Sequence, residues 1–314
     1  FAELGEQFST TPSRAINYAD LFFERTTARR QFMLCAQILK HIDAGSPIRF
    51  LVAECENPAT MIGALYLARQ YGVDHKLDLS PLFETPEALD RGGRFVERLL
   101  EDANFCAYIQ KRGYLSIQLG FSDSGRFVGQ VSGNMAIERI HRLVGRALSA
   151  KGLYVDILIF NTHGESMGRG AYPGTFKQRF DHLLTPHVRS VFAKDDLHPI
   201  HEVSFQGGDG FLHFATPELA EATLIGFVEH LIETPLEQVD PFYTRRDLTW
   251  DIYRGLRIWH ERLLDDPDYQ QVLSGFALGF PVNAGSRKRK RPDAGAGGPR
   301  ALRAISHNAV LQQL

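Results

Sequence analysis

The sequence predicts an α/β fold, a partial parallel (β/α) TIM-like barrel that continues into a large helical C-terminal extension. Between residues 48 and 216, short apolar runs alternate with longer segments of helical periodicity. This alternation is typical of parallel strands joined by right-handed crossover helices. Beyond residue 216 the strand-like runs stop and long amphipathic patterns begin. We therefore expect an N-terminal helical segment at 1–47, the barrel portion at 48–216, and a helical region with a basic, glycine-rich loop at 217–314.

The expected elements follow one another in a regular order. Apolar residues between 13 and 42 recur at helical spacing and predict one or two helices. The helix expected at 57–72 begins with the cap-like pair Asn57 and Pro58 and closes at Gly72. Strands are expected at 48–55, 75–84, 113–124, 154–166 and 201–214, and further helices at 85–102, 130–150, 217–233 and 240–266.

Composition limits the class of protein. At 314 residues and 44% hydrophobic content the chain can bury a large core, as one large domain or two. The formal net charge of -2 gives no global attraction to nucleic acid or to a membrane surface. No apolar run approaches the roughly 18 to 20 residues of a membrane span, and the first residues lack the pattern of a secretion signal. Three scattered cysteines, at positions 35, 55 and 106, fit reduced thiols, so we expect a cytoplasmic protein.

Polar side chains gather where the predicted strands end. Residues of this kind stand at or just past the carboxyl ends of five predicted strands: Glu54, Glu84, Asp123, His163 and Gln206. Parallel α/β barrels build their active sites at this edge. Any one of these residues is also explained as a loop residue or a helix cap. Three acids, a histidine and several glycines on one edge favour a functional site over caps alone.

A basic run near the C-terminus, residues 287–291, lies beside a glycine-rich stretch. It fits an anion-binding loop, a nuclear-localisation-like patch or a solvated loop, and the last is the commonest case. Nucleic-acid binding is disfavoured because the run has no interleaved aromatic residues and the net charge is negative.

Six short stretches follow one another along the chain: "PLFETPEALD", "GFSDSGRFVG", "THGESMGRGAYP", "DIYRG", "GSRKRKRP" and "RALRAI". In this order and at this spacing they resemble phosphoenolpyruvate carboxylase across most of residues 48–306. Any one of them is weak evidence, but six collinear ones indicate homology.

The resemblance implies a Mg²⁺- or Mn²⁺-dependent carbon-carbon lyase. Such an enzyme condenses phosphoenolpyruvate with bicarbonate to oxaloacetate and phosphate, and so feeds the tricarboxylic acid cycle. It also implies a homo-oligomer, a tetramer in the family, and an acidic effector such as aspartate or malate. By motif matching, Glu84 and Asp123 are the metal ligands, and two carboxylates with open positions suit a hard divalent cation. Arg126, three residues beyond Asp123, would face the anions gathered there.

The departures from the family pattern fall on the cations that should grip a trianionic substrate. Arg126 stands where the family has lysine, and a planar guanidinium does not replace an ammonium conservatively. In the glycine-rich stretch Arg169 is kept, but His163 takes the place of the family's first arginine. Phe211 and His213 stand at positions of an arginine and a lysine. Each charge-assisted bond lost costs about 1.5 to 3 kcal/mol, so two losses would cripple substrate binding. Arg287 and Lys290 fall near family positions that bind acidic inhibitors.

The resemblance also implies a catalytic histidine in a T-A-H-P-T motif, which this sequence does not contain. We therefore expect the chain to be the middle and C-terminal part of a longer protein and to be inactive alone. Three functions stay open: a divergent phosphoenolpyruvate carboxylase, a metal-dependent barrel paralogue acting on another carboxylate, and a catalytically decayed regulatory or assembly protein. The presence of both Glu84 and Asp123 favours the first two.

Overall fold

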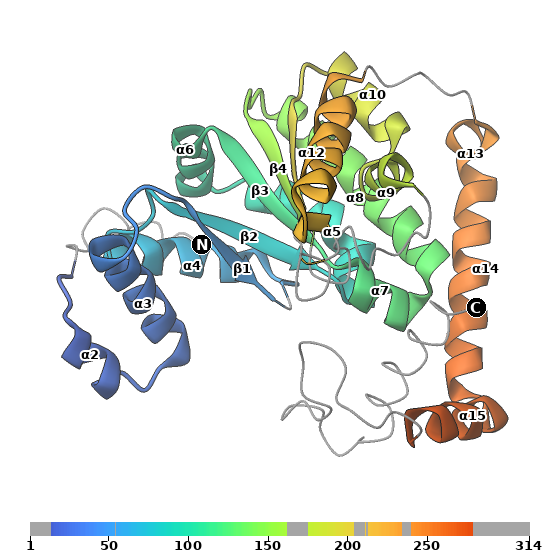
Figure 1. Ribbon diagram of the computed structural model, residues 1–314, viewed down its shortest axis with the longest axis horizontal. Coiled ribbons are helices and arrows are strands. Elements are labelled where there is room, and N and C mark those ends of the chain that lie inside the picture. Colours follow the sequence, from blue (N-terminus) through green and yellow to red (C-terminus); the bar gives the residue numbers. More distant parts are fainter. Residues whose placement is uncertain are drawn as a thin grey trace.

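The computed structural model describes residues 14–53, 55–161, 175–203, 211, 213–233 and 240–278. A five-stranded parallel sheet in the order β1-β2-β3-β4-β5 forms its centre (Figure 1). The strands are β1 (Ile48–Val52), β2 (Leu77–Phe83), β3 (Tyr114–Leu119), β4 (Asp156–Asn161) and β5 (Pro199–Glu202). The predicted α/β class and the parallel pairing are confirmed.

Helices connect each strand to the next. Because every strand is added on the same side of the previous one, right-handed crossovers place these helices on one face of the sheet. They are α4 (Pro58–Gln70), α5 (Pro86–Leu99), α6 (Ala103–Arg112), α7 (Phe121–Val128), α8 (Gln130–Ala150), α9 (Phe176–Leu183) and α10 (Pro186–Lys194). The first of them begins as predicted, since the Asn57 side chain accepts a hydrogen bond from the Ala59 backbone N–H at 3.0 Å.

The hydrophobic core lies between the sheet and these helices. It contains alternate strand residues, among them Leu79, Ile117 and Ile159. Two buried leucines of the other strand face, Leu82 and Leu158, do not belong to it. The sheet therefore has an apolar face that the helices cover and a second face of different character.

This second face is mainly polar, and it is concave. The Arg49 Nε of β1 donates to the Glu202 Oε2 of β5 at 2.8 Å, although these strands are the two outer strands of the sheet. In a flat sheet of five strands they would stand about 19 Å apart, farther than an arginine and a glutamate can bridge. The sheet must therefore curl so that its outer strands approach each other.

A buried ion network lies at the amino end of the concave face, centred on Asp78, which is 0% exposed. Asp78 Oδ1 accepts hydrogen bonds from Arg112 Nη2 at 2.7 Å and from the Tyr114 hydroxyl at 2.9 Å. Its other oxygen pairs with Arg49. Burial, and then the bond to Asp78, raise the pKa of Tyr114. The carboxylate is fully paired, as a buried charge must be.

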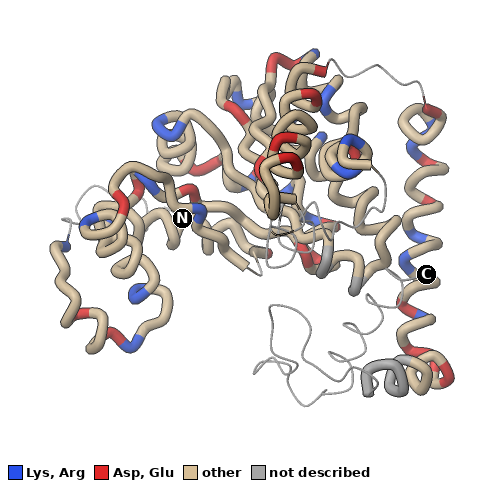
Figure 2. The backbone as a smooth tube through the Cα atoms, viewed as in Figure 1, with Lys and Arg blue, Asp and Glu red and all other residues tan. Residues whose placement is uncertain are grey.

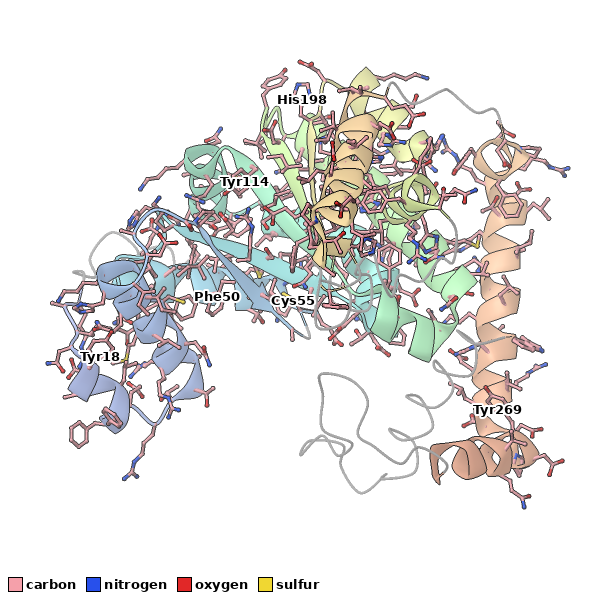
Figure 3. The ribbon with its side chains drawn as sticks, viewed as in Figure 1. Tyr18, Phe50, Cys55, Tyr114, His198 and Tyr269 are labelled. Atoms are coloured by element: carbon pink, nitrogen blue, oxygen red, sulfur yellow. The ribbon has the colours of Figure 1, made fainter. Side chains whose placement is uncertain are left out.

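The remaining helices precede β1 or follow β5, and Figure 1 shows the first and the last of them at opposite sides of the molecule. They are α2 (Tyr18–Phe23), α3 (Thr27–His41), α12 (Pro217–Ile232), α13 (Pro241–Thr244), α14 (Arg246–Asp265) and α15 (Pro267–Leu278). Phe32 of α3 stacks on Phe50 of β1, with 4.5 Å between ring centroids, and Figure 3 labels Phe50 at this contact. Figure 2 shows acidic and basic residues interspersed along α14.

The three cysteines at positions 35, 55 and 106 are free thiols. Burial raises the pKa of Cys35 to about 11 and that of Cys55 to about 12, so these thiols stay protonated and unreactive. Within the described part of the chain, no helix combines the length and the apolar character needed to cross a lipid bilayer.

Several predicted boundaries are wrong. The strand expected at 113–124 ends at Leu119, and Asp123 lies in helix α7 instead of at a strand end. The strand expected at 201–214 ends at Glu202, and Phe211 and His213 are helical. The helix expected at 240–266 is broken at Arg245, between α13 and α14.

Candidate metal and substrate site

Glu84 directly follows β2 at its carboxyl end and is buried, with 8% of its surface exposed. The next residue, Thr85, caps α5, and its Oγ1 accepts a hydrogen bond from the Ala88 backbone N–H at 3.1 Å. The carboxylate is therefore placed between the end of a strand and the start of a helix. This is the edge at which α/β barrels carry functional side chains.

Gly120, at the end of β3, lies against Glu84. Its N–H donates to the Phe83 carbonyl at 3.0 Å. A Cβ built on Gly120 would stand 2.6 Å from Glu84 Cβ and 3.1 Å from its Oε2, so only glycine leaves room for this carboxylate. Residues 118 and 120 point to the same side of their strand. The Glu84 side chain therefore leans over the concave face.

Asp123 and Arg126 are carried by α7, which starts one residue after Gly120. The Ser124 N–H donates to the Gly120 carbonyl at 2.9 Å, so the first turn of α7 is anchored at the end of β3. The backbone thus brings Asp123 to the strand end on which Glu84 packs. The side chains of Asp123 and Arg126 are not among those described, so the meeting of the two carboxylates stays a prediction.

Gln118 was not among the residues predicted from sequence. It lies on the concave face, two residues before Gly120, and is 0% exposed. Neither its Oε1 nor its Nε2 has a hydrogen-bond partner among the described residues. An amide buried in this way costs free energy that a structural role alone does not explain. A signal was available in the sequence, since Ser116 and Gln118 alternate with Ile117 and Leu119.

Other predicted site residues cannot be placed. His163, Arg169, Arg287 and Lys290 lie outside the described residues, as do Glu54 and Gln206. Of the two departures farther along the chain, the Phe211 side chain is 74% exposed. His213 contacts the Phe176 ring, with 5.9 Å between centroids. Neither supplies a fixed positive charge.

Oxygen ligands are present at this edge, but a complete metal centre is not visible. In the described part of the chain, no three His, Cys, Asp or Glu side chains converge into a metal-binding group. A site made of Glu84 and Asp123 has only two protein ligands, and water and substrate oxygens would complete it. Such a site does not need three converging protein side chains. The buried Glu84 carboxylate fits a hard divalent cation.

Comparisons with known proteins point to one family. Residues 22–176 match the family model described as phosphoenolpyruvate carboxylase. A phosphoenolpyruvate carboxylase of Thermus sp. is 30% identical over 128 residues, which are 39% of this chain and 15% of that protein. The enzyme of Pseudomonas paraeruginosa is 25% identical over 265 residues, 82% of this chain and 28% of the relative. The enzyme of Edwardsiella ictaluri is 24% identical over 275 residues, which are 86% of this chain and 29% of that relative.

The chain is a divergent member of the phosphoenolpyruvate carboxylase family. The matched region contains the five segments that form β1 to β4 and α7, and therefore Glu84, Gly120 and Asp123. The aligned part of the chain corresponds to 28% and 29% of the length of the two longer-matching relatives.

Proposed function

We propose that this chain carries the metal- and substrate-binding part of a phosphoenolpyruvate carboxylase-like lyase that forms oxaloacetate and phosphate from phosphoenolpyruvate and bicarbonate. One observation carries the proposal. The buried Glu84 lies at the carboxyl edge of a curled parallel sheet and packs against Gly120, where any larger residue would clash with it. Both residues belong to the segment that matches the family. The product would feed the tricarboxylic acid cycle, in the cytoplasm.

The proposal includes a closed barrel. Sequential strand order with all crossovers in one direction is the arrangement of a (β/α) barrel, and the contact between Arg49 and Glu202 shows strong curvature. We assign β1 to β5 to an arc of that barrel, with the regions divided at 47/48 and at 216/217. The α3 and β1 contact packs the N-terminal segment against the arc.

Glu84 and Asp123 would hold Mg²⁺ or Mn²⁺. A divalent ion at this position supplies electrostatic stabilisation to the negative charge that develops on the substrate as phosphate leaves. The chain's own residues bind and orient the substrate: Arg126, His163 and Arg169 contact its anionic groups, and the Gln118 amide donates from below. Burial of Glu84 lowers the dielectric around its carboxylate and so strengthens the interaction of that carboxylate with a cation.

A second candidate is a metal-dependent paralogue that acts on a less anionic carboxylate. The exposed Phe211 favours it, since this side chain provides no cation to a phosphate. The neutral Gln118 amide on the concave face is also suited to a carboxylate or carbonyl oxygen. A regulatory or assembly protein with a decayed site is the third candidate. The first candidate, the phosphoenolpyruvate carboxylase-like lyase, would also be a homo-oligomer. It would bind an acidic effector such as aspartate or malate at Arg287 and Lys290.

The test uses the intact protein with phosphoenolpyruvate, bicarbonate and Mg²⁺, with oxaloacetate followed through malate dehydrogenase. Wild type should form oxaloacetate, and Glu84→Gln and Asp123→Ala should each lower kcat by about a hundredfold or more because charge stabilisation is lost. Both variants should melt as the wild type does. Glu97→Gln, an exposed glutamate of α5, is the matched control and should keep full activity.

A silent wild type whose melting temperature still rises with Mg²⁺, in a manner that Asp123→Ala abolishes, would replace the first candidate by the second. If the wild-type protein neither forms oxaloacetate nor gains stability from Mg²⁺, the third candidate, a regulatory or assembly protein, would be favoured.

A further inference from the structure

Helices α8, α13 and α14 enclose a cavity of about 450 Å³. At one end it is lined by Arg142 and Arg146 of α8 and by Arg246, the first residue of α14. The same three residues line an adjoining cavity of about 620 Å³. We call them the arginine cluster. Arg142 and Arg146 stand four residues apart and so project from one face of α8.

The arginine cluster has no acidic partner at ion-pair distance among the described residues. None of its members forms an ion pair among the described residues, whereas Arg189 pairs with Asp181 at 2.6 Å and Arg112 with Asp78 at 2.7 Å. The two acids that line the 450 Å³ cavity, Glu138 and Asp240, have other partners. The Tyr243 hydroxyl donates to Glu138 at 3.3 Å, and the Phe242 N–H donates to Asp240 at 2.8 Å, where Asp240 caps α13.

The guanidinium groups of the cluster also act on one another. Burial, and then the positive charges of Arg146 and Arg246, lower the pKa of Arg142, and the nearby Glu138 offsets this only in part. Like charges gathered beside a cavity are unfavourable unless something compensates them. A bound anion would do so, and arginine is the side chain best suited to phosphate through paired N–H donors.

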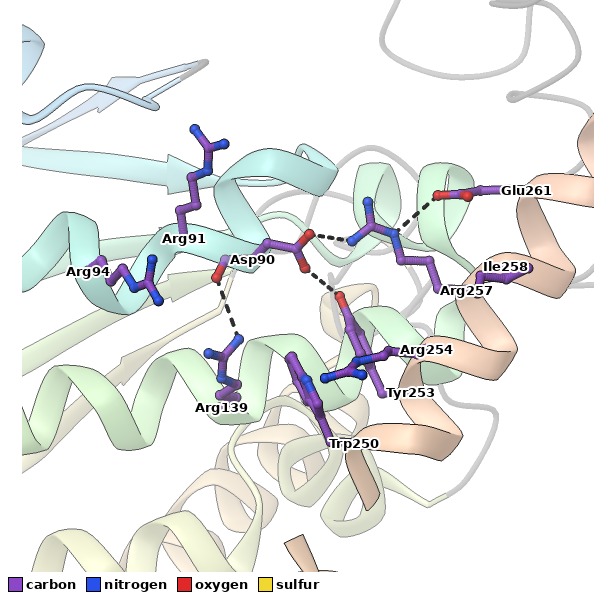
Figure 4. A pocket seen from close by; sticks show the side chains of 10 residues that line it. All are labelled: Asp90, Arg91, Arg94, Arg139, Trp250, Tyr253, Arg254, Arg257, Ile258 and Glu261. Carbon is purple, nitrogen blue, oxygen red and sulfur yellow. Dashed lines mark hydrogen bonds and ion pairs between the residues drawn. The ribbon is translucent and has the colours of Figure 1, made fainter. Parts of the chain in front are cut away.

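The other end of the cavity is apolar and aromatic, with Met135, Leu143, Phe242 and Trp250 in its lining. The Trp250 ring stacks on Tyr253 at 4.6 Å and 16°. Arg139 lies over it, 4.4 Å from the ring centroid (Figure 4). The wall is therefore fixed from two sides. A cavity with an apolar wall and a few convergent charged groups is typical of a small-molecule site.

We propose that this cavity binds a small phosphorylated ligand with a ring-sized apolar body, the phosphate on the arginine cluster and the ring against Phe242 and Trp250. Arg142 stands about 18 Å along α8 from the first residue of that helix, which is the end nearest α7 and Glu84. The site is therefore separate from the proposed metal site, and it does not depend on the proposed function.

A neighbouring cavity between α5 and α14 is less suited to an anion, although it is also rich in arginine. Asp90 lies in it and accepts a hydrogen bond from the Tyr253 hydroxyl at 2.8 Å while pairing with Arg257 (Figure 4). Glu261 pairs with Arg257 from the other side at 3.2 Å. Asp90 fastens α14 to α5, Glu261 pairs within α14, and the two carboxylates offset the positive charge there.

The experiment is calorimetric titration of the intact protein, without divalent metal, with phenyl phosphate and with inorganic phosphate. Phenyl phosphate should bind at least about tenfold more tightly than phosphate, because its ring adds burial of apolar area. Arg246→Glu, an exposed position, should weaken binding by about ten- to a hundredfold, since a charge-assisted contact becomes repulsive. Arg98→Glu, an exposed arginine of α5, makes the same change of charge elsewhere and should leave binding as in wild type.

Phenyl phosphate could also enter the strand-edge site, so the titration is repeated with Glu84→Gln and Arg142→Gln, each checked by its melting curve. The proposal predicts unchanged binding in the former and weakened binding in the latter. Absence of binding to wild type overturns it. The proposal is also overturned if Glu84→Gln loses phenyl phosphate binding while Arg246→Glu binds phenyl phosphate as tightly as wild type.

Discussion

The two ends of the concave face are built in opposite ways. At the amino end, every oxygen of Asp78 is paired with an arginine or a tyrosine. Toward the carboxyl end, the Gln118 amide has no partner among the described residues, and Glu84 is pressed against a glycine. The contrast separates stability from function: the amino end holds its buried acid in closed pairs, while the carboxyl end holds a buried amide with no partner among the described residues.

The largest effect should come from the amino end. Asp78→Ala removes the acid that Arg49, Arg112 and Tyr114 share. Breaking a buried ion pair from one side costs about 3 to 5 kcal/mol, so the free energy of unfolding should fall by that amount in a denaturant titration. Asp251→Ala, on the exposed side of α14, should change it by less than about 0.5 kcal/mol. Equal effects of the two substitutions would contradict a structural role for the network.

The second test is at the carboxyl end. Gly120→Ala places a methyl group 2.6 Å from Glu84 Cβ, and such overpacking costs about 1 to 3 kcal/mol of unfolding free energy. It should also displace the carboxylate, so carboxylation should fall more than stability does.

Gly63→Ala is its control. Gly63 lies in α4, and a Cβ there meets nothing within 4 Å, so this change should stabilise the protein by up to about 1 kcal/mol. If Gly120→Ala behaved like Gly63→Ala, the close packing at Glu84 would be refuted.

The smallest effect concerns Gln118. Gln118→Leu removes two unpaired polar atoms from a buried position and should raise the free energy of unfolding by about 1 kcal/mol while lowering activity. Gln37 is a useful comparison because its Nε2 donates to the Ile16 carbonyl at 3.2 Å. Gln37→Leu should therefore give no gain in stability. A stabilised Gln118→Leu protein with full activity would remove Gln118 from the site.

Much of the fold could be predicted from periodicity. Alternating apolar runs located β1 to β4, and the Asn57-Pro58 pair located the start of α4. Periodicity failed where tertiary packing decides. The strand expected at 113–124 was drawn too long, since β3 ends at Leu119 and α7 begins at Phe121. The short helices α6, α9 and α10 were missed because each has fewer turns than a periodic pattern needs to stand out.

The candidate site was only partly predictable. Glu84 and Asp123 were predicted through motif resemblance; Glu84 follows β2 at its carboxyl end, and its role as a metal ligand stays a prediction. Gln118 belongs to no family motif, and its only signal was the alternation of Ser116 and Gln118 with apolar residues in β3. The partners of Asp78 are 29 to 36 positions away in sequence, so the network could not be recognised before the strands were paired.

The bond between Arg49 and Glu202 joins residues 153 positions apart. Almost all of the sheet must be in place before it can form, and the entropy of closing so long a loop must be offset by contacts already made. We therefore expect this bond to form late in folding. Premature termination of the chain before β5 would leave a sheet whose first strand has lost its cross-strand anchor, open to pairing with other chains.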